Sequence, residues 1–148
     1  MTFFAKELII FDLDGTLIDS APDLALSINL MLVDLQLEPV DEAVIRTWVG
    51  NGAQVLVERA LAYTYPSKPV PIAFIADALA IFLNHYQQNL VVKSVLYPDV
   101  HSTLTTLKQQ GFTLALVTNK PERFIAPILA VMELDAVFSY VLGGDSLE

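Results

Sequence analysis

Short apolar runs and longer amphipathic stretches alternate along the chain, and their spacing predicts the secondary structure. Residues 7–12 form a short run rich in Ile and Leu that ends in a polar break, which is typical of a buried strand. Residues 112–117 and 136–142 show the same texture, and each follows a stretch with helical spacing, at residues 99–110 and 121–132. This order of strands and helices predicts an α/β fold with a Rossmann-like parallel sheet, in which ligands bind beyond the carboxyl ends of the strands.

The segment between the first two strands carries only helical patterns. Ser20 is placed to cap a helix, with Pro22 in the first turn and Asp23 three residues after the cap. Asp41 is placed to cap a second helix. The predicted helices of this segment cover residues 20–35, 41–48, 53–63 and 72–88. We therefore expect two domains, a partial α/β core made of residues 1–16 and 95–148 and an inserted all-helical domain made of residues 17–94.

Composition and charge narrow the classes of partner. Apolar residues make up 54% of the chain, so a core can form, and 17 acidic residues against 8 basic ones give a formal net charge of −9. Such a balance disfavours binding to nucleic acid and to anionic membrane surfaces, which favour clusters of Lys and Arg. The chain has no cysteine, which excludes disulfides and thiolate metal sites and fits a cytoplasmic location.

Two carboxylates follow the first predicted strand directly. Asp12 and Asp14 are two positions apart, so on a strand both would point to the same side. Two close carboxylates repel each other when both are ionised, unless a cation intervenes. They could therefore share Mg²⁺, or act as a nucleophile and a general acid, and a phosphoryl-transfer site can use both. A plain hairpin turn at Asp14-Gly15 is the structural alternative, whereas an EF-hand fits poorly because Gly15 follows Asp14 directly.

A second polar cluster, Thr118, Asn119 and Lys120, follows the strand predicted at residues 112–117. A hydroxyl, an amide, free helix N–H groups and a cation can all bind phosphate oxygens there. A simple helix cap is the alternative for this turn taken alone. In combination with Asp12 and Asp14 on a neighbouring parallel strand, phosphate binding explains both clusters.

At these residues the chain resembles the haloacid-dehalogenase-like phosphatases. The first family motif, an apolar strand followed by D-x-D-G-T, matches residues 11–16, and the second, a strand that ends in Thr or Ser, matches residues 116–120. Further stretches of similarity to this family run through nearly the whole chain.

The resemblance implies a role for each matched residue. Asp12 would attack phosphorus and form an aspartyl phosphate, and Asp14 would protonate the leaving alkoxide and later activate water. Mg²⁺ would be bound by the Asp12 carboxylate and the Asp14 backbone carbonyl. Thr118 would hydrogen-bond the transferring phosphoryl group, with Asn119 and Lys120 beside it. The implied substrate is a small phosphorylated metabolite.

The helical insertion resembles the family's mobile cap, which closes over the site and excludes water. Gly50, Asn51 and Gly52 resemble the cap loop that meets the non-phosphate end of the substrate, although an ordinary turn between helices explains them equally well. We interpret the remaining prominent side chains of this part as structural. They are Trp48 packed between helices, Arg46 and Arg59 in solvent, and His85, which has no acid paired with it in the sequence pattern.

The chain departs from the family at its C-terminal end. The family places a lysine shortly after the segment that matches residues 143–147, and then a strand with a further metal-binding acid, whereas this sequence ends at Glu148. Asp145 lies too early to be that acid. We therefore expect weak or no activity from this chain alone. We also expect an unpaired sheet edge at the first strand, through which the chain self-associates or becomes only marginally stable.

Other functions stay open at this point. A phosphosugar mutase uses the same scaffold and the same aspartyl phosphate, and a non-catalytic remnant that only binds metal would keep the first two motifs. A phosphorylated receiver domain also pairs acids with Mg²⁺ and a Thr. Such domains alternate strand and helix throughout, so the long helical segment argues against them.

Overall fold

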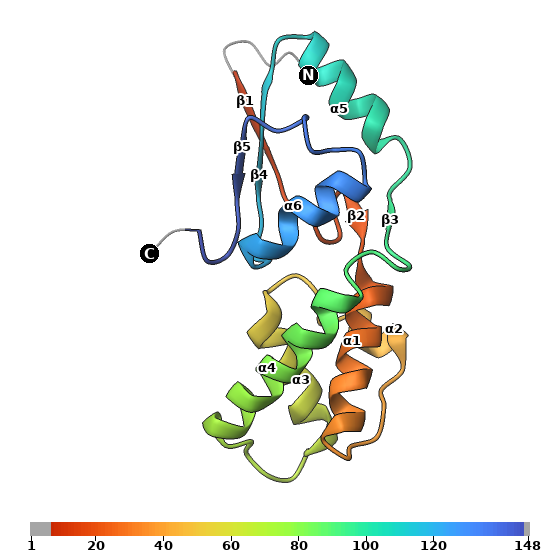
Figure 1. Ribbon diagram of the computed structural model, residues 1–148, viewed down its shortest axis with the longest axis vertical. Coiled ribbons are helices and arrows are strands. Elements are labelled where there is room, and N and C mark those ends of the chain that lie inside the picture. Colours follow the sequence, from red (N-terminus) through yellow and green to blue (C-terminus); the bar gives the residue numbers. More distant parts are fainter. Residues whose placement is uncertain (1–6, 147–148) are drawn as a thin grey trace. The chain divides into compact units, whose positions relative to one another are not determined.

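The computed structural model describes residues 7–146, so residues 1–6 and 147–148 of the predicted core lie outside it. The chain divides into two compact units (Figure 1). One comprises Met1–Asp19 with Val95–Glu148, and the other Ser20–Ser94. Residues 17–19, which the sequence pattern assigned to the insertion, lie in the first unit. Within the described part of the chain, no helix combines the length and the apolar character needed to cross a membrane.

The first unit is built on a parallel sheet, which confirms the predicted α/β class. The strands β1 (Leu8–Phe11), β4 (Thr113–Val117) and β5 (Tyr140–Leu142) lie in the order β1-β4-β5, and both pairings are parallel. Helix α5 (Val100–Gln109) precedes β4, and helix α6 (Glu122–Val131) joins β4 to β5. Parallel crossovers are right-handed, so both helices pack on one face of the sheet, as Figure 1 shows.

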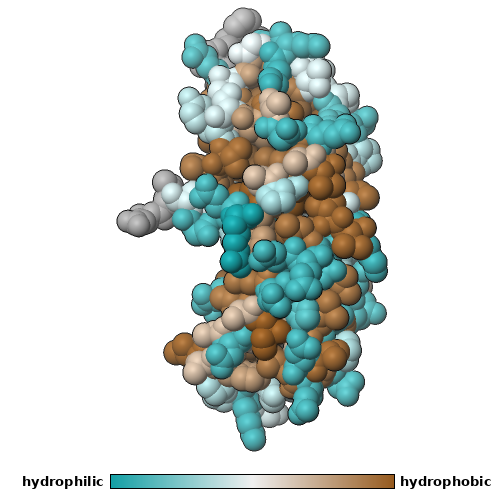
Figure 2. Space-filling view, in the orientation of Figure 1, coloured by the Kyte–Doolittle hydropathy of each residue, from teal (hydrophilic) through white to brown (hydrophobic). Residues whose placement is uncertain are grey.

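The other face of this sheet is largely open within the described unit. On the helix-covered face, Leu114 and Leu116 are 1% and 0% exposed. On the opposite face, Ile10 of β1 and Tyr140 of β5 are 59% and 63% exposed. Apolar side chains therefore reach the surface of the protein, as the space-filling view also shows (Figure 2). The prediction of a buried first strand was wrong, because one face of β1 is uncovered; within residues 7–146 β1 also lies at the edge of the sheet, as expected.

A small antiparallel pair was missed by the sequence analysis. β2 (Ile18–Asp19) pairs with β3 (Val95–Leu96), with Ile18 opposite Leu96 and Asp19 opposite Val95. Two residues per strand give no periodic signal, and the partners are far apart in the sequence, so pattern reading could not find them. The pair lies where the chain leaves the sheet unit and returns to it.

The second unit is entirely helical in its secondary structure. Its elements are α1 (Ala21–Asp34), α2 (Glu42–Arg46), α3 (Ala53–Thr64) and α4 (Ile72–Gln88). α4 packs against α1 and α3, and α2 packs against α1. Fully buried apolar side chains, such as Ile28, Val57 and Phe82, fill the space between these helices. The helical unit thus has a hydrophobic core of its own.

Candidate functional site

The two predicted polar clusters lie at the same edge of the sheet. In the parallel pairing of β1 with β4, Phe11 stands opposite Leu116. Asp12 follows Phe11 directly, and Thr118 comes two residues after Leu116. The polar residues that follow the two strands therefore lie at the same end of the sheet. The carboxyl ends of parallel strands are where α/β folds bind ligands.

Asp14 reaches this edge by a different route from the one predicted. The strand ends at Phe11, and the chain then turns, with the N–H groups of Thr16, Leu17 and Ile18 all donating to the Leu13 carbonyl. Gly15 permits this turn because its φ is +78°. The alternation of side chains along a strand therefore does not explain the position of Asp14, and the alternative of a plain hairpin turn is not what this segment forms, since β1 and β2 do not pair with each other.

The carboxylates have different local partners. One Asp12 oxygen accepts a hydrogen bond of 2.7 Å from the Leu13 N–H, and the Asp12 residue is exposed. The Asp14 Oδ2 atom lies 3.2 Å from the Lys120 Nζ atom. The Lys120 side chain is only 3% exposed and that of Asp14 13%. A buried ammonium group therefore stands directly beside one acid of the pair and partly balances the negative charge there.

Thr118 and Lys120 form a tight turn after β4. The Thr118 N–H donates to the Leu142 carbonyl at 3.0 Å, and the Thr118 Oγ1 atom accepts from the Lys120 N–H at 3.2 Å. Because the hydroxyl oxygen acts as acceptor in that bond, its hydrogen is left as a donor. Asn119 is exposed between these two buried residues.

The first N–H of α6, by contrast, is not left for a phosphate. The Glu122 N–H donates to the Asp145 Oδ1 atom at 2.7 Å, so a carboxylate of the protein caps this helix. The expectation of free helix N–H groups is therefore wrong at this position. Two adjacent glycines before Asp145 were the sequence signal for a close backbone approach that could have revealed this contact.

The third predicted group, Gly50, Asn51 and Gly52, lies in the helical unit, between α2 and α3. Gly50 and Gly52 have φ values of +121° and +89°, which L side chains rarely adopt. The Arg59 guanidinium donates to the Trp48 carbonyl at 2.7 Å and so fixes the start of this loop. Arg59 is thus a structural donor and not the solvated residue that was expected.

Other predicted side chains of the helical unit also have partners. The Trp48 ring lies 5.4 Å from the Tyr63 ring, and Arg46 pairs with Glu42 on the exposed face of α2. The His85 Nε2 atom lies 2.7 Å from the Asp34 Oδ2 atom, so this histidine does have a paired acid, which joins α4 to α1. This correction needed the packing of two helices that are distant in the sequence.

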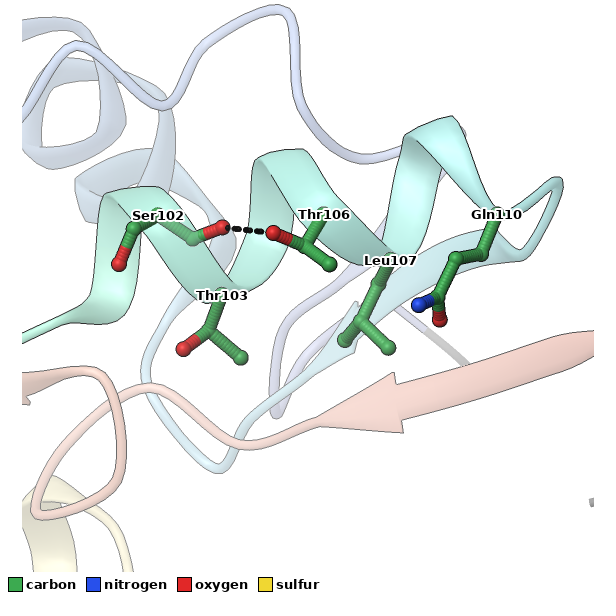
Figure 3. A pocket seen from close by; sticks show the side chains of 5 residues that line it. All are labelled: Ser102, Thr103, Thr106, Leu107 and Gln110. Atoms are coloured by element: carbon green, nitrogen blue, oxygen red, sulfur yellow. Dashed lines mark hydrogen bonds between the residues drawn. The ribbon is translucent and has the colours of Figure 1, made fainter. Parts of the chain in front are cut away.

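A hollow of about 360 Å³ beside α5 holds none of the predicted site residues (Figure 3). Its lining is uncharged and comprises Ser102, Thr103, Thr106, Leu107 and Gln110. In the same view the Thr106 hydroxyl donates to the Ser102 carbonyl at 2.8 Å. Without a charged group or an unusual contact, this hollow carries no chemistry.

Comparisons with known proteins agree with the motifs. The family described as Haloacid dehalogenase-like hydrolase matches residues 9–148. A phosphoglycolate phosphatase of Colwellia psychrerythraea is 52% identical over 143 residues, which are 96% of this chain and 63% of the relative. One of Pseudomonas putida is 48% identical over 140 residues, 95% of this chain and 51% of the relative.

A solved structure shows the same likeness in three dimensions. A predicted phosphoglycolate phosphatase from Haemophilus somnus superposes with a TM-score of 0.88 at 46% identity, covering 96% of this chain and 64% of that one. The chain thus spans less than two thirds of the length of these relatives. The motifs, the sheet and the family match together show that the chain belongs to the haloacid dehalogenase-like hydrolases.

Proposed function

We propose that the protein is a Mg²⁺-dependent phosphatase that hydrolyses a small phosphomonoester, with 2-phosphoglycolate as the first substrate to test. The observation that carries the proposal is the common sheet edge, where Asp12 and Asp14 meet the turn of Thr118 and Lys120. The phosphoglycolate phosphatases at about half sequence identity support the choice of substrate. A cytoplasmic location belongs to the same proposal and rests on the absence of cysteine.

In the first chemical step, one Asp12 carboxylate oxygen attacks phosphorus and the bond from phosphorus to the ester oxygen breaks. The Leu13 N–H on the other Asp12 oxygen holds the carboxylate in place during the attack. Asp14 gives a proton to the departing alkoxide, and in the second step it removes a proton from the water that attacks the aspartyl phosphate. Phosphate leaves and Asp12 is restored.

Thr118 and Lys120 act on the phosphoryl group and on Asp14. The Thr118 hydroxyl hydrogen is available to a phosphoryl oxygen, because the oxygen of this hydroxyl already accepts the Lys120 N–H. The Lys120 ammonium lies 3.2 Å from Asp14, so it steadies the charge of this carboxylate after the proton has left. Asn119, which is exposed between Thr118 and Lys120, would bind a phosphate oxygen in this proposal.

The oxygen donors at this edge fit Mg²⁺. This ion prefers oxygen ligands and is commonly held by one or two carboxylates while it keeps several waters. The exposed Asp12 carboxylate and the Asp14 backbone carbonyl would supply such donors. Among residues 7–146 no group of three or more acids or histidines is placed to hold a metal, so waters and substrate would complete the shell. When bound, Mg²⁺ supplies charge stabilisation for the phosphoryl group.

The helical unit serves as a cap in this proposal. Its loop at Gly50, Asn51 and Gly52 meets the part of the substrate that is not phosphate, and closure excludes bulk water from the site. The Arg59 bond to the Trp48 carbonyl supports this proposal, because it anchors the backbone two residues before the loop.

The test is release of inorganic phosphate from 2-phosphoglycolate with Mg²⁺, measured for wild type, Asp12→Asn and Asp135→Asn. The exposed Asp135 is the matched control, because its substitution changes the net charge equally. The assay is run on the 148-residue chain and on a chimera extended at its C-terminus with the part of the Colwellia relative that this chain does not match. Asp12→Asn should lower kcat at least about 10³-fold. Normal phosphate release by Asp12→Asn, or formation of a phosphate isomer without hydrolysis, would contradict the proposal.

A further inference from the structure

The loop after β5, residues 143–146, is bonded to the turn that carries Lys120; we call it the 143–146 loop. The Gly144 N–H donates to the Lys120 carbonyl at 2.9 Å, and the Asp145 carboxylate accepts the Glu122 N–H at 2.7 Å. These two bonds hold the backbone on both sides of Pro121, where the turn enters α6. The loop therefore fixes the path of the chain around Lys120.

The loop also fits against this turn without any free space. An added Cβ at Gly143 would lie 2.7 Å from the Glu122 nitrogen and 2.8 Å from the Lys120 carbonyl oxygen. At Gly144 it would lie 2.6 Å from the Asn119 carbonyl oxygen. These are backbone atoms, so a larger residue could be accommodated only if residues 119–122 moved.

The loop is closed on itself by Ser146. Its hydroxyl oxygen accepts the Gly143 N–H at 2.7 Å, and the hydroxyl donates to the Glu122 carboxylate at 3.0 Å. The loop thus has its own internal bonds in addition to those it makes to the turn, and it behaves as a preformed support.

Lys120 is the residue on which this support acts. Its carbonyl is held by Gly144, its N–H by Thr118, and its ammonium group lies beside Asp14. The side chain is 3% exposed, so it cannot find a new position in solvent without leaving the site. A shift of the backbone at residues 119–122 must therefore change the contact between Lys120 and Asp14.

We propose that the 143–146 loop positions Lys120 against Asp14, with Gly144 and Asp145 as the positioning residues. The effect of this positioning on catalysis rests on the proposed phosphatase function, whereas the contact between the 143–146 loop and the Lys120 turn does not depend on it. A loop that only capped α6 would affect stability and leave the Lys120 contact unchanged, and Asp145→Asn would then change little, because Asp and Asn cap helices about equally well. A loop that positions Lys120 also controls the ammonium contact and the turnover of the enzyme.

The experiment compares Gly144→Ala, Asp145→Ala and Asp145→Asn with the control Gly111→Ala. Gly111 lies in the same unit with a φ of +88° and nothing within 4 Å of an added Cβ, so its substitution strains the backbone without pushing another segment. The first readout is the ¹⁵N–¹H signal of the Lys120 ammonium in the ¹⁵N-lysine-labelled chain, assigned with Lys120→Gln. The second is kcat and KM for 2-phosphoglycolate in whichever form of the protein is active.

We expect Gly144→Ala and Asp145→Ala to shift or broaden away the Lys120 signal, Asp145→Asn to retain it in part, and Gly111→Ala to leave it unchanged. For Gly144→Ala, kcat should fall about 10- to 100-fold, because small misplacements of site groups have effects of that size. KM should change less than kcat.

An unchanged Lys120 signal in Gly144→Ala would overturn the proposal, and so would a changed signal with kcat equal to that of Gly111→Ala. If wild type releases no phosphate in either form, the phosphatase proposal fails, while the Lys120 signal still decides whether the loop positions this lysine.

Discussion

Replacement of Asp23 tests the most heavily bonded carboxylate of the helical unit. Asp23 is 0% exposed, in the first turn of α1. Its two oxygens accept the N–H groups of Val92 at 3.0 Å, of Lys93 at 2.9 Å and of Ser94 at 2.8 Å, together with the Ser94 hydroxyl at 2.6 Å. One side chain thus satisfies three consecutive backbone donors of the returning chain.

The contacts of Asp23 determine how much its replacement should lower the free energy of unfolding. A hydrogen bond to a charged group contributes about 1.5–3 kcal/mol, and each buried donor left without an acceptor costs about 1–3 kcal/mol. Asp23→Ala leaves three N–H groups without this acceptor, so we expect the free energy of unfolding to fall by at least about 3 kcal/mol. Asp23→Asn keeps one oxygen but turns an amide donor toward the N–H groups, so its loss should be about 2–4 kcal/mol.

The assay is urea unfolding followed by circular dichroism, combined with hydrogen exchange of the amides of residues 92–94. Asp41→Ala is the matched control, because Asp41 is an exposed N-cap of the same unit that accepts a single N–H, from Ala43 at 2.7 Å. Its loss should be about 1 kcal/mol. If Asp23→Asn loses no more stability than Asp41→Ala, or if exchange at residues 92–94 stays slow, the reasoning is refuted.

Three further outcomes follow from other contacts. The exposed apolar face and edge of β1 should make the chain self-associate as its concentration rises, and Ile10→Lys should prevent this association. Sedimentation velocity that shows a monomer for wild type at every concentration would contradict this prediction. Loss of the partly exposed pair of His85 with Asp34, in His85→Gln, should cost less than about 1 kcal/mol in urea unfolding, and a larger loss would be unexpected. Arg59→Lys should free the backbone at Trp48 and raise the quenching of its fluorescence by iodide, whereas unchanged quenching would show that the bond does not hold this loop.

The helices were the part of the fold that the sequence predicted best. The helix predicted at residues 72–88 is observed as Ile72–Gln88, and the one predicted at residues 53–63 as Ala53–Thr64. Long apolar periodicity and flanking Pro or Gly give local signals that do not depend on the rest of the chain. The helix expected at residues 41–48 is shorter, Glu42–Arg46.

Strands were predicted less well, because their limits depend on partners. The run at residues 136–142 is apolar except for Ser139, yet the strand covers only Tyr140–Leu142, while Phe138 contacts the ring of Phe11. The exposure of β1 could not be read from its apolar residues either, since it depends on which elements cover each face.

The candidate site, too, was predicted only in part from the sequence. The position of Asp12 and of Thr118 after neighbouring parallel strands followed from local patterns, and the pairing of β1 with β4 confirms that these strands are neighbours. The pairing of Lys120 with Asp14 and the cap that Asp145 places on α6 join segments distant in the sequence. The two adjacent glycines before Asp145 signal a close backbone approach but do not name its partner, and nothing in the spacing of Asp14 and Lys120 indicates their contact, so both pairings required the three-dimensional structure.

The short ribbon of β2 and β3 has an evolutionary consequence. Asp19 and Val95 are direct register partners, so the two ends of the 75 or so intervening residues emerge next to each other. A segment with adjoining ends can be lengthened, exchanged or replaced by a short link while the host sheet keeps its connectivity. Evolution can therefore enlarge or replace the helical unit without a change in the sheet or in Asp12 and Asp14, which follow its first strand.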